Sequence, residues 1–303
     1  MVGLGKLRRQ LRQLQLERID LALDLDHLPG DLCTLRQHLK HVGSLRTTVR
    51  QINALYRPKN KVPNLRQSKA VRADPHCHTL SSDGMVNPAQ LVEAAMAAKL
   101  DLIAVTDHDT MASVKETQQR GEGAGIQVVA GQEITTRWPA QTHLLAWFLD
   151  EPVKRGMSLE DSVKAIHDQG GLAIIPHPFM PVYVASVQPD MLRRLIENHP
   201  IDGIEMVFTV PIGARRRKQL DAFYAANKER LGAAIGGSDC HFGEHDIGIA
   251  VTEYDGDFKT AVKTAATRPR RLKDKRDVPI GIAARQQWRA LVDLPLRRLR
   301  GHV

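Results

Sequence analysis

From residue 71 onward, short apolar segments alternate with segments of helical periodicity, and no other feature of the sequence restricts the fold as much. Seven apolar segments have the length and composition of buried strands. Strands that alternate with helices predict a parallel α/β architecture. We expect strands at Val71–Cys77, Leu102–Thr106, Ile126–Ala130, His143–Phe148, Leu172–Ile175, Gly203–Phe208 and Ala233–Gly237, and helices at Pro88–Lys99, Ala112–Gln119, Leu159–Asp168, Asp190–Asn198 and Arg215–Glu229.

Histidines and carboxylates fall at the ends of most of these segments. In a barrel the carboxyl ends of the strands converge on one face, so a barrel explains this placement better than an open sheet does. Imidazole nitrogen and carboxylate oxygen are preferred ligands of Zn, Mn and Fe. The pattern therefore predicts a metal centre built from His76, His78, the run Asp107–Asp109, Glu133, His143, His177, Asp239 and His241.

The alternative for any one of these histidines is a hydrogen-bonded core residue. That alternative is the more frequent one for a single buried histidine near a strand end. Chance alone does not explain why six strand ends all carry such residues. His76 and His78 also share one face of their strand, because side chains on a strand repeat with a period of two.

Six short motifs resemble, in order and spacing, those of the polymerase and histidinol phosphatase (PHP) family. The resemblance covers about residues 72–255, and within the family it is greatest to the stand-alone phosphoesterases, a group that includes nucleoside 3′,5′-bisphosphate phosphatases and RNA 5′-end exonucleases. It implies a distorted seven-stranded β/α barrel, related to the TIM barrel, that cleaves phosphate esters with two or three divalent ions. The motifs are Asp74–Thr79, Ser82–Gly84, Thr106–Thr110, Gly131–Glu133, His177-Pro178 and Gly237–His241.

The resemblance also implies a role for each candidate residue. His76, His78, Glu133 and Asp239 resemble the ligands of a first metal ion. Glu133 resembles a bridge to a second ion that is also held by His143 and His177. The remaining candidate ligands, Asp83, His108 and His241, resemble those of a third ion, and the residues expected to take part in catalysis are Glu133, Asp239 and His241.

The reaction that we expect is attack on a phosphate ester by a metal-activated water. Phosphate also calls for a cationic clamp, for which Arg137 and Arg215 are candidates, although charge runs such as residues 215–218 are usually solvated. The acid for the leaving group is open between His241, Asp109 and a metal-bound water. The substrate is expected to be a small phosphorylated metabolite or nucleotide. The alternatives are a nuclease that uses the same site and a non-catalytic, metal-stabilised binding module.

Charge divides the chain into three regions. Residues 1–72 carry fifteen Lys and Arg against five Asp and Glu, residues 268–303 carry eleven against three, and the middle is acidic. We expect a basic helical extension and linker at 1–70, a phosphoesterase domain at 71–267 and a basic tail at 268–303. The basic ends suit nucleic acid or an anionic membrane surface, and a solvated surface is the alternative. We expect no obligate protein partner. Three cysteines and the lack of a secretion signal predict the cytoplasm.

Overall fold

The structure is a computed structural model that describes residues 70–181, 185–274 and 277–299. The expected helical extension at 1–70 lies almost wholly outside the described residues. Within them, no helix is long and apolar enough to cross a membrane.

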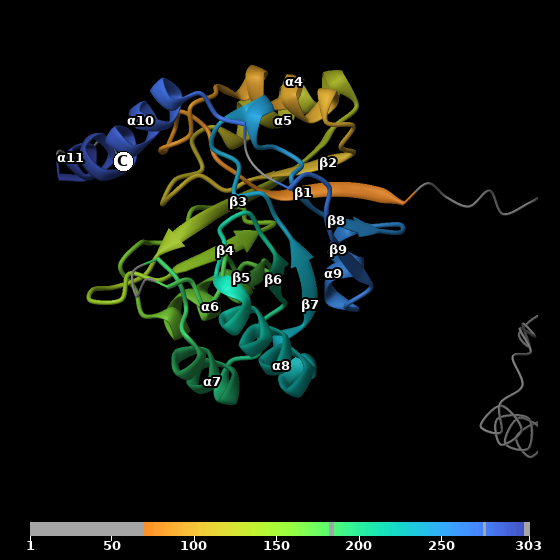
Figure 1. Ribbon diagram of the computed structural model, residues 1–303, viewed down its shortest axis with the longest axis vertical. Helices are drawn as coiled ribbons and strands as arrows, with labels where there is room; N and C mark the ends of the chain where they lie inside the picture. Colours follow the sequence, from red (N-terminus) through yellow and green to blue (C-terminus); the bar gives the residue numbers. More distant parts are fainter. Residues whose placement is uncertain (1–69, 182–184, 275–276, 300–303) are drawn as a thin grey trace, which may run out of the picture. The chain divides into compact units, whose positions relative to one another are not determined.

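One mixed sheet of nine strands forms the centre of the described chain (Figure 1). Its spatial order is β7-β6-β5-β4-β3-β2-β1-β8-β9. Seven of the eight neighbouring pairs are consecutive along the chain, as is common where connections are short. The strands are β1 (Val71–Cys77), β2 (Leu102–Val105), β3 (Gln127–Thr135), β4 (His143–Trp147), β5 (Leu172–Ile175), β6 (Gly203–Val207), β7 (Ala233–Gly236), β8 (Ala250–Tyr254) and β9 (Thr267–Arg271).

The expected count of seven strands is wrong, because β8 and β9 extend the sheet beyond β1. Only a short 3-10 helix, η2 (Gly243–His245), separates β7 from β8, so a search for strands that alternate with longer helices misses β8. Strand β9 reads Thr-Arg-Pro-Arg-Arg and is largely exposed, so it has no apolar alternation. Its proline is tolerated because β9 pairs along only one side.

The expected parallel arrangement is present at only four of the eight neighbouring pairs. Strand β4 runs antiparallel to both β3 and β5, and β8 runs antiparallel to both β1 and β9. A connection of seven residues, Thr136 to Thr142, joins β3 to β4. A connection this short favours a reversal of direction, because a parallel crossover needs about a dozen residues or more.

The sheet curves until its two ends meet, which makes it a nearly closed barrel. Thr252 of β8 hydrogen-bonds Gly236 of β7 in both directions, with its Oγ1 2.9 Å from the backbone nitrogen and from the carbonyl oxygen. The Oγ1 of Thr267 in β9 donates to the carbonyl of Ala234 at 2.7 Å. Side-chain hydroxyls thus join the ends of the sheet, and the barrel fold that the sequence predicts is present in this coarser form.

Helices cover the sheet, and two of them begin at a residue whose side chain caps the helix. The side chain of Asn87 accepts from Gln90 N, and that of Ser158 accepts from Asp161 N. Five helices match the expected segments to within a few residues, and three more follow β8. They are α4 (Pro88–Ala97), α5 (Val114–Ala124), α6 (Leu159–Asp168), α7 (Pro189–Asn198), α8 (Gly213–Leu231), α9 (Phe258–Lys263), α10 (Ile280–Trp288) and α11 (Leu294–Leu299), and a π-helical segment, η3 (Arg289–Asp293), joins the last two.

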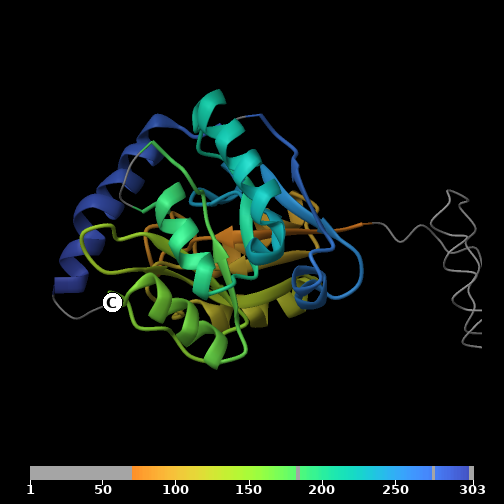
Figure 2. The ribbon, with the colours of Figure 1, turned by 90° about the horizontal axis from the view of Figure 1, so that it is seen from below.

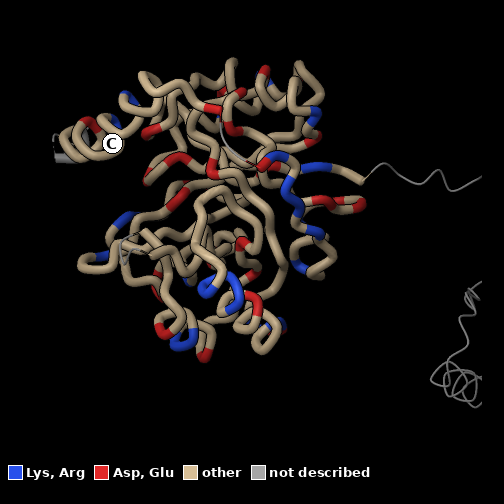
Figure 3. Tube along the Cα trace, viewed as in Figure 1, with Lys and Arg blue, Asp and Glu red and all other residues tan. Residues whose placement is uncertain are grey.

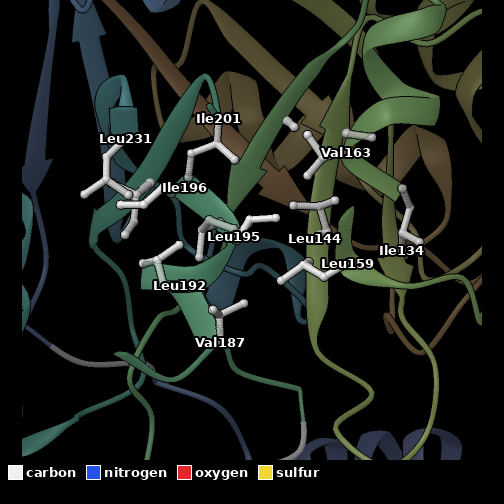
Figure 4. Close-up of a cluster of buried hydrophobic side chains, with 14 of the residues drawn as sticks. Ile134, Leu144, Leu159, Val163, Val187, Leu192, Leu195, Ile196, Ile201 and Leu231 are labelled. Carbon is white, nitrogen blue, oxygen red and sulfur yellow. The ribbon is translucent and has the colours of Figure 1, made fainter. Parts of the chain in front are cut away.

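The largest apolar cluster lies between the sheet and the helices α6 and α7 (Figure 4). Leu159, Val163 and Ile166 recur at helical spacing on α6 and are buried. Leu192 and Leu195 do the same on α7. Burial of such side chains contributes roughly 1.5–3 kcal/mol each. This packing fixes the strands whose ends carry the candidate ligands.

Candidate metal centre

The predicted ligands come together at one end of the barrel. His76 lies at the end of β1, His78 directly follows that strand, and His177 lies just past β5. His143 begins β4, yet it joins the same group because β4 runs antiparallel and pairs its first residue with Thr135, the last residue of β3. The reversed strand thus delivers a histidine from its amino end to the edge where its neighbours deliver theirs from their carboxyl ends.

Eight of the nine predicted ligands fall into three overlapping groups whose ligand atoms lie within 4.8 Å of one another. Each group combines histidine nitrogens with at least one carboxylate oxygen. The groups are His76, His78, Glu133 and Asp239; His78, Asp83, His108 and His241; and His108, Glu133 and His143.

In the first group, two nitrogens face two oxygens. His76 Nε2 lies 3.2 Å from Glu133 Oε2 and 3.3 Å from Asp239 Oδ1. His78 Nε2 lies 3.1 and 3.3 Å from the same two oxygens. His76, His78 and Glu133 are buried. Asp239 is the most exposed of the four, with 15% of its side chain accessible.

The second group surrounds one oxygen of Asp83. Its Oδ1 lies 3.3 Å from His241 Nε2, 3.7 Å from His108 Nε2 and 3.9 Å from His78 Nδ1. The ring of His78 stacks on that of His241 with the ring centroids 4.3 Å apart. Asp83 is 4% exposed, so this carboxylate is buried among imidazoles.

The third group surrounds Glu133, whose two oxygens face different histidines. Its Oε1 lies 2.8 Å from His143 Nδ1 and 3.1 Å from His177 Nε2. Its Oε2 faces His76, His78 and, at 3.4 Å, His108 Nδ1. Glu133 is therefore the one carboxylate that connects the two sides of the cluster.

These separations fit bound metal ions. Ligand atoms roughly 2.0–2.2 Å from a shared ion lie roughly 3.0–3.5 Å from one another, which is the spacing in the first group. Several buried atoms also lack a hydrogen-bond partner of acceptable geometry among the described residues, although charged neighbours are close. They are His78 Nε2, Asp83 Oδ1, His108 Nδ1 and His177 Nδ1. Such groups are costly to bury unless something else coordinates them.

The charges in the cluster are strongly coupled. Burial by itself would raise the pKa of Glu133, but the nearby imidazoles of His143, His108 and His76 hold that pKa well below its usual range. Burial would lower the pKa of His78, but Asp239 and Glu133 raise it to about 10. The carboxylates therefore attract positive charge, and a divalent cation would supply it in place of protons.

Burial, helped by repulsion from His78 and His143, lowers the pKa of His108 to about 3, although Glu133 and Asp83 oppose this. His108 is thus neutral at physiological pH. A neutral imidazole keeps the lone pair that a metal ligand needs.

Two histidines are oriented by acceptors behind them. His76 Nδ1 donates to Glu205 Oε1 at 2.9 Å, and His241 Nδ1 donates to the carbonyl of Asp239 at 2.9 Å. Each contact leaves the Nε2 lone pair directed at the cluster, as is typical of histidine ligands.

Glu205 is a residue that the sequence interpretation missed. It is fully buried on β6, and its Oε2 also accepts from the backbone nitrogen of His177 at 2.7 Å. A carboxylate in the middle of an apolar strand is the signal that could have found it. Gly237 makes room for it, because a Cβ there would lie 2.4 Å from Glu205 Oε1.

Two further buried aspartates hold the loops that carry the candidate ligands. Asp107 accepts from Thr79 N at 2.7 Å, from Thr79 Oγ1 and Ser82 Oγ at 2.6 Å each, and from Ser113 Oγ. Asp74 accepts from Ser238 N at 2.9 Å, and burial raises the pKa of Asp74 to about 7.

The backbone is strained at two candidate ligands. His177 and Asp239 have φ values of 27° and 53°, in the region that residues other than glycine rarely adopt. Backbone strain of this kind concentrates at functional sites.

The phosphate-binding role of Arg137 and Arg215 stays a prediction. Arg137 is in the connection between β3 and β4 and, with Trp138 and Arg194, lines a cavity of about 170 Å³ beside the start of α6. Arg215 is exposed in the first turn of α8, where Figure 3 shows basic residues. Asp109, a candidate acid, accepts from Thr135 N at 2.7 Å.

Comparisons with known proteins show which family the chain belongs to. A family model described as "PHP domain" matches residues 74–155. An uncharacterized protein of Methanocaldococcus jannaschii is 31% identical over 147 residues, which is 45% of this chain and 81% of that protein.

The relatives with named activities include an exoribonuclease and a phosphatase. A 5′-3′ exoribonuclease of Haemophilus influenzae is 32% identical over 102 residues, which is 33% of this chain and 37% of the enzyme. A 3′,5′-nucleoside bisphosphate phosphatase of Chromobacterium violaceum is 22% identical over 204 residues, 59% of this chain and 70% of the enzyme. The chain thus spans about a third of the length of the exoribonuclease.

The fold is also seen in solved structures. One of them is a two-domain protein of Bacteroides vulgatus that contains a predicted PHP-like metal-dependent phosphoesterase. The alignment has a TM-score of 0.57 and 20% identity, and it covers 76% of this chain and 72% of the other.

Proposed function

The chain belongs to the PHP family of metal-dependent phosphoesterases, and we propose that it hydrolyses a small phosphorylated metabolite or nucleotide with two or three divalent metal ions at the barrel end. The observation that carries this proposal is the position of Glu133, whose two oxygens face separate sets of histidines. A carboxylate in this position suits a bridge between two ions.

The residues fit two or three ion positions. His76, His78, Glu133 and Asp239 would hold one ion, and Glu133 with His143 and His177 would hold a second. Asp83, His108 and His241 would hold a third. Nitrogen and oxygen donors of this kind suit Mn, Zn or Fe. When bound, such ions neutralise the charge of the phosphate and lower the pKa of a water so that it attacks at neutral pH.

The protein's own groups set the geometry of that chemistry. Glu205 and the Asp239 carbonyl hold the rings of His76 and His241 with Nε2 directed inward. Asp109 is occupied by Thr135 N, which makes it a weaker candidate for the leaving-group acid than a group that faces the cluster. His241 contacts Asp83 and Asp239 and has a pKa that burial would lower but Asp83 raises. A His241 whose Nε2 holds an ion has no proton to donate from that atom, so neither residue is preferred here as the proton donor.

A nuclease that uses the same site is the second candidate, and the exoribonuclease relative favours it. Basic residues along β9 and at the start of α8 could contact a phosphate backbone (Figure 3). Binding of nucleic acid or of an anionic membrane through the basic ends stays a prediction. So do the cytoplasmic location and the roles of Arg137 and Arg215.

The test is a panel of phosphate esters assayed beside single-stranded RNA and DNA, with Mn²⁺ and with chelator. We expect release of phosphate from small esters that stops after exhaustive chelation and returns with metal. Preferential release of mononucleotides from RNA would favour the nuclease. Metal binding with no turnover of either class would favour a non-catalytic binding module.

A further inference from the structure

Helix α10, near the end of the chain, contacts the loop that carries Asp83 (Figures 1 and 2). Most of α10 is exposed, and Gln286 is its buried residue, with 6% exposure. Its Nε2 donates to Asp83 Oδ2 at 3.1 Å, across 203 positions of the chain. A buried polar side chain on an otherwise exposed helix indicates a specific task.

The amide of Gln286 is held in the orientation that makes it a donor. Gln287 Nε2 donates to Gln286 Oε1 at 3.0 Å, so the oxygen is occupied. The reversed amide would set its oxygen against a carboxylate oxygen and a donor against a donor, which are both repulsive.

The two oxygens of Asp83 therefore have different surroundings. Oδ1 faces His241 and His108, and Oδ2 receives the hydrogen bond from Gln286. An outer hydrogen bond of this kind fixes the rotation of a carboxylate and directs its other oxygen at the ion.

The next turn of the same segment fixes the backbone of this loop. Arg289 Nη2 donates to the carbonyl of Leu80 at 2.9 Å and to that of Ser82 at 2.8 Å. On the loop's inner side, Ser82 Oγ is bound to Asp107. Gly84 packs so closely that a Cβ there would lie 2.6 Å from the carbonyl carbon of His78. The loop is thus held from inside by the barrel and from outside by the C-terminal helical segment.

We propose that Gln286 is a positioning residue for the ion held by Asp83, His108 and His241, so that affinity at this position depends on the docking of α10. The inference rests on the proposed metal centre. It gives the C-terminal segment, expected from the sequence to be a basic tail, a part in the site.

The experiment compares Mn²⁺ binding by the full chain and by Gln286→Met, because methionine keeps the size of the side chain and removes its donor. The matched control is Arg285→Met, which alters an exposed neighbour on the same helix. Calorimetric titration gives the number and affinity of the ions, and elemental analysis checks the number. We expect about 10–100-fold weaker binding of one ion in Gln286→Met, unchanged binding of the others, and a wild-type profile in the control.

Two more measurements separate the possible failures. Asp83→Asn should abolish the ion that Gln286→Met weakens, and if it leaves all binding intact, the proposed third position fails and the inference with it. If Asp83→Asn removes one ion while Gln286→Met binds every ion as wild type does, only the inference is overturned. Equal weakening of all ions with a lower unfolding temperature of the metal-free protein would make Gln286 merely structural and would also overturn it.

Discussion

At the scale of single residues, Glu133 is the centre of the site. It is 1% exposed, and both of its oxygens lie within 3.2 Å of histidine nitrogens from three strand ends. A neutral amide in its place keeps the shape but loses the charge that offsets bound cations.

We expect Glu133→Gln to lower turnover by roughly a hundredfold or more, because metal ions supply several kcal/mol of charge stabilisation in such reactions. Steady-state kinetics on an active ester from the panel, with metal content measured in parallel, checks this. Glu116→Gln, an exposed change on α5, is the control and should be neutral. Near wild-type turnover with intact metal content would show that Glu133 is not the bridge.

Glu205 offers a second test at this scale. In Glu205→Gln, the new amide group must face either His76 Nδ1–H or the backbone N–H of His177, which are both donors. One buried donor then has no acceptor, which costs about 1–3 kcal/mol. We expect the free energy of unfolding in denaturant to fall by that amount and metal affinity to fall with it. Glu160→Gln, exposed on α6, serves as control. Unchanged metal affinity would mean that Glu205 does not orient His76.

At the scale of elements, local pattern predicted the strands that are buried on both faces. The expected bounds of β1 and β5 agree with the structure, and those of β2, β6 and β7 differ by one residue. The direction of β4 was missed because β3 runs on to Thr135 and does not end at Ala130 as expected, so the connection to β4 looked long enough for a parallel crossover. The contact of Gln286 with Asp83 could not be predicted from local pattern, because the two residues are 203 positions apart in the sequence.

The candidate site was more predictable than the topology. Each candidate ligand lies next to a strand segment in the sequence. The strand ends of a barrel converge on one face whatever the order of the strands. What the sequence could not supply was the set of groups behind the ligands. Glu205 and Gln286 are ordinary residues in their own segments, and only the folded chain brings them to His76 and Asp83.

Helix α9 carries a prediction that concerns pH. Asp257 Oδ1 accepts from Thr260 N at 2.8 Å and from Thr260 Oγ1 at 2.7 Å, and these bonds lower the pKa of Asp257 below its ordinary 3.8. A carboxylate whose pKa is lowered by folding stabilises the folded state above its unfolded pKa and loses that effect as pH falls through the folded pKa. Asp257→Ala should therefore cost about 1 kcal/mol at pH 7, as is usual for an N-cap, and less below about pH 4.

Denaturant unfolding at pH 7 and at pH 3 measures this difference. Asp257→Asn is the matched control, because asparagine caps helices as well as aspartate does and does not titrate. A destabilisation by alanine that is the same at both pH values would show that the charge of Asp257 adds nothing to the cap.

At the scale of the whole molecule, charge and chemistry are separated along the chain. Every candidate ligand lies between His76 and His241, in the acidic middle, and the sheet is complete from Val71 to Arg271. Residues 1–66 carry thirteen of the Lys and Arg and contain none of the candidate ligands. We therefore expect hydrolysis of a small ester to need only the later part of the chain, and attraction of large polyanions to draw on the basic start.

A variant that lacks residues 1–66 should therefore fold and hydrolyse a small phosphate ester at close to the full rate. We also expect it to bind single-stranded RNA more weakly, with a shallower dependence of affinity on salt, because each phosphate contact that is lost removes one released counterion. Kinetics on the ester and fluorescence titrations with RNA between 50 and 200 mM salt measure the two effects. Deletion of residues 1–66 and separate replacement of the exposed Arg268 and Arg270 by Gln distinguish the two basic ends. An insoluble or inactive variant would show that residues 1–66 are part of the structure that supports the barrel, and an unchanged salt slope would show that their charge contacts only solvent.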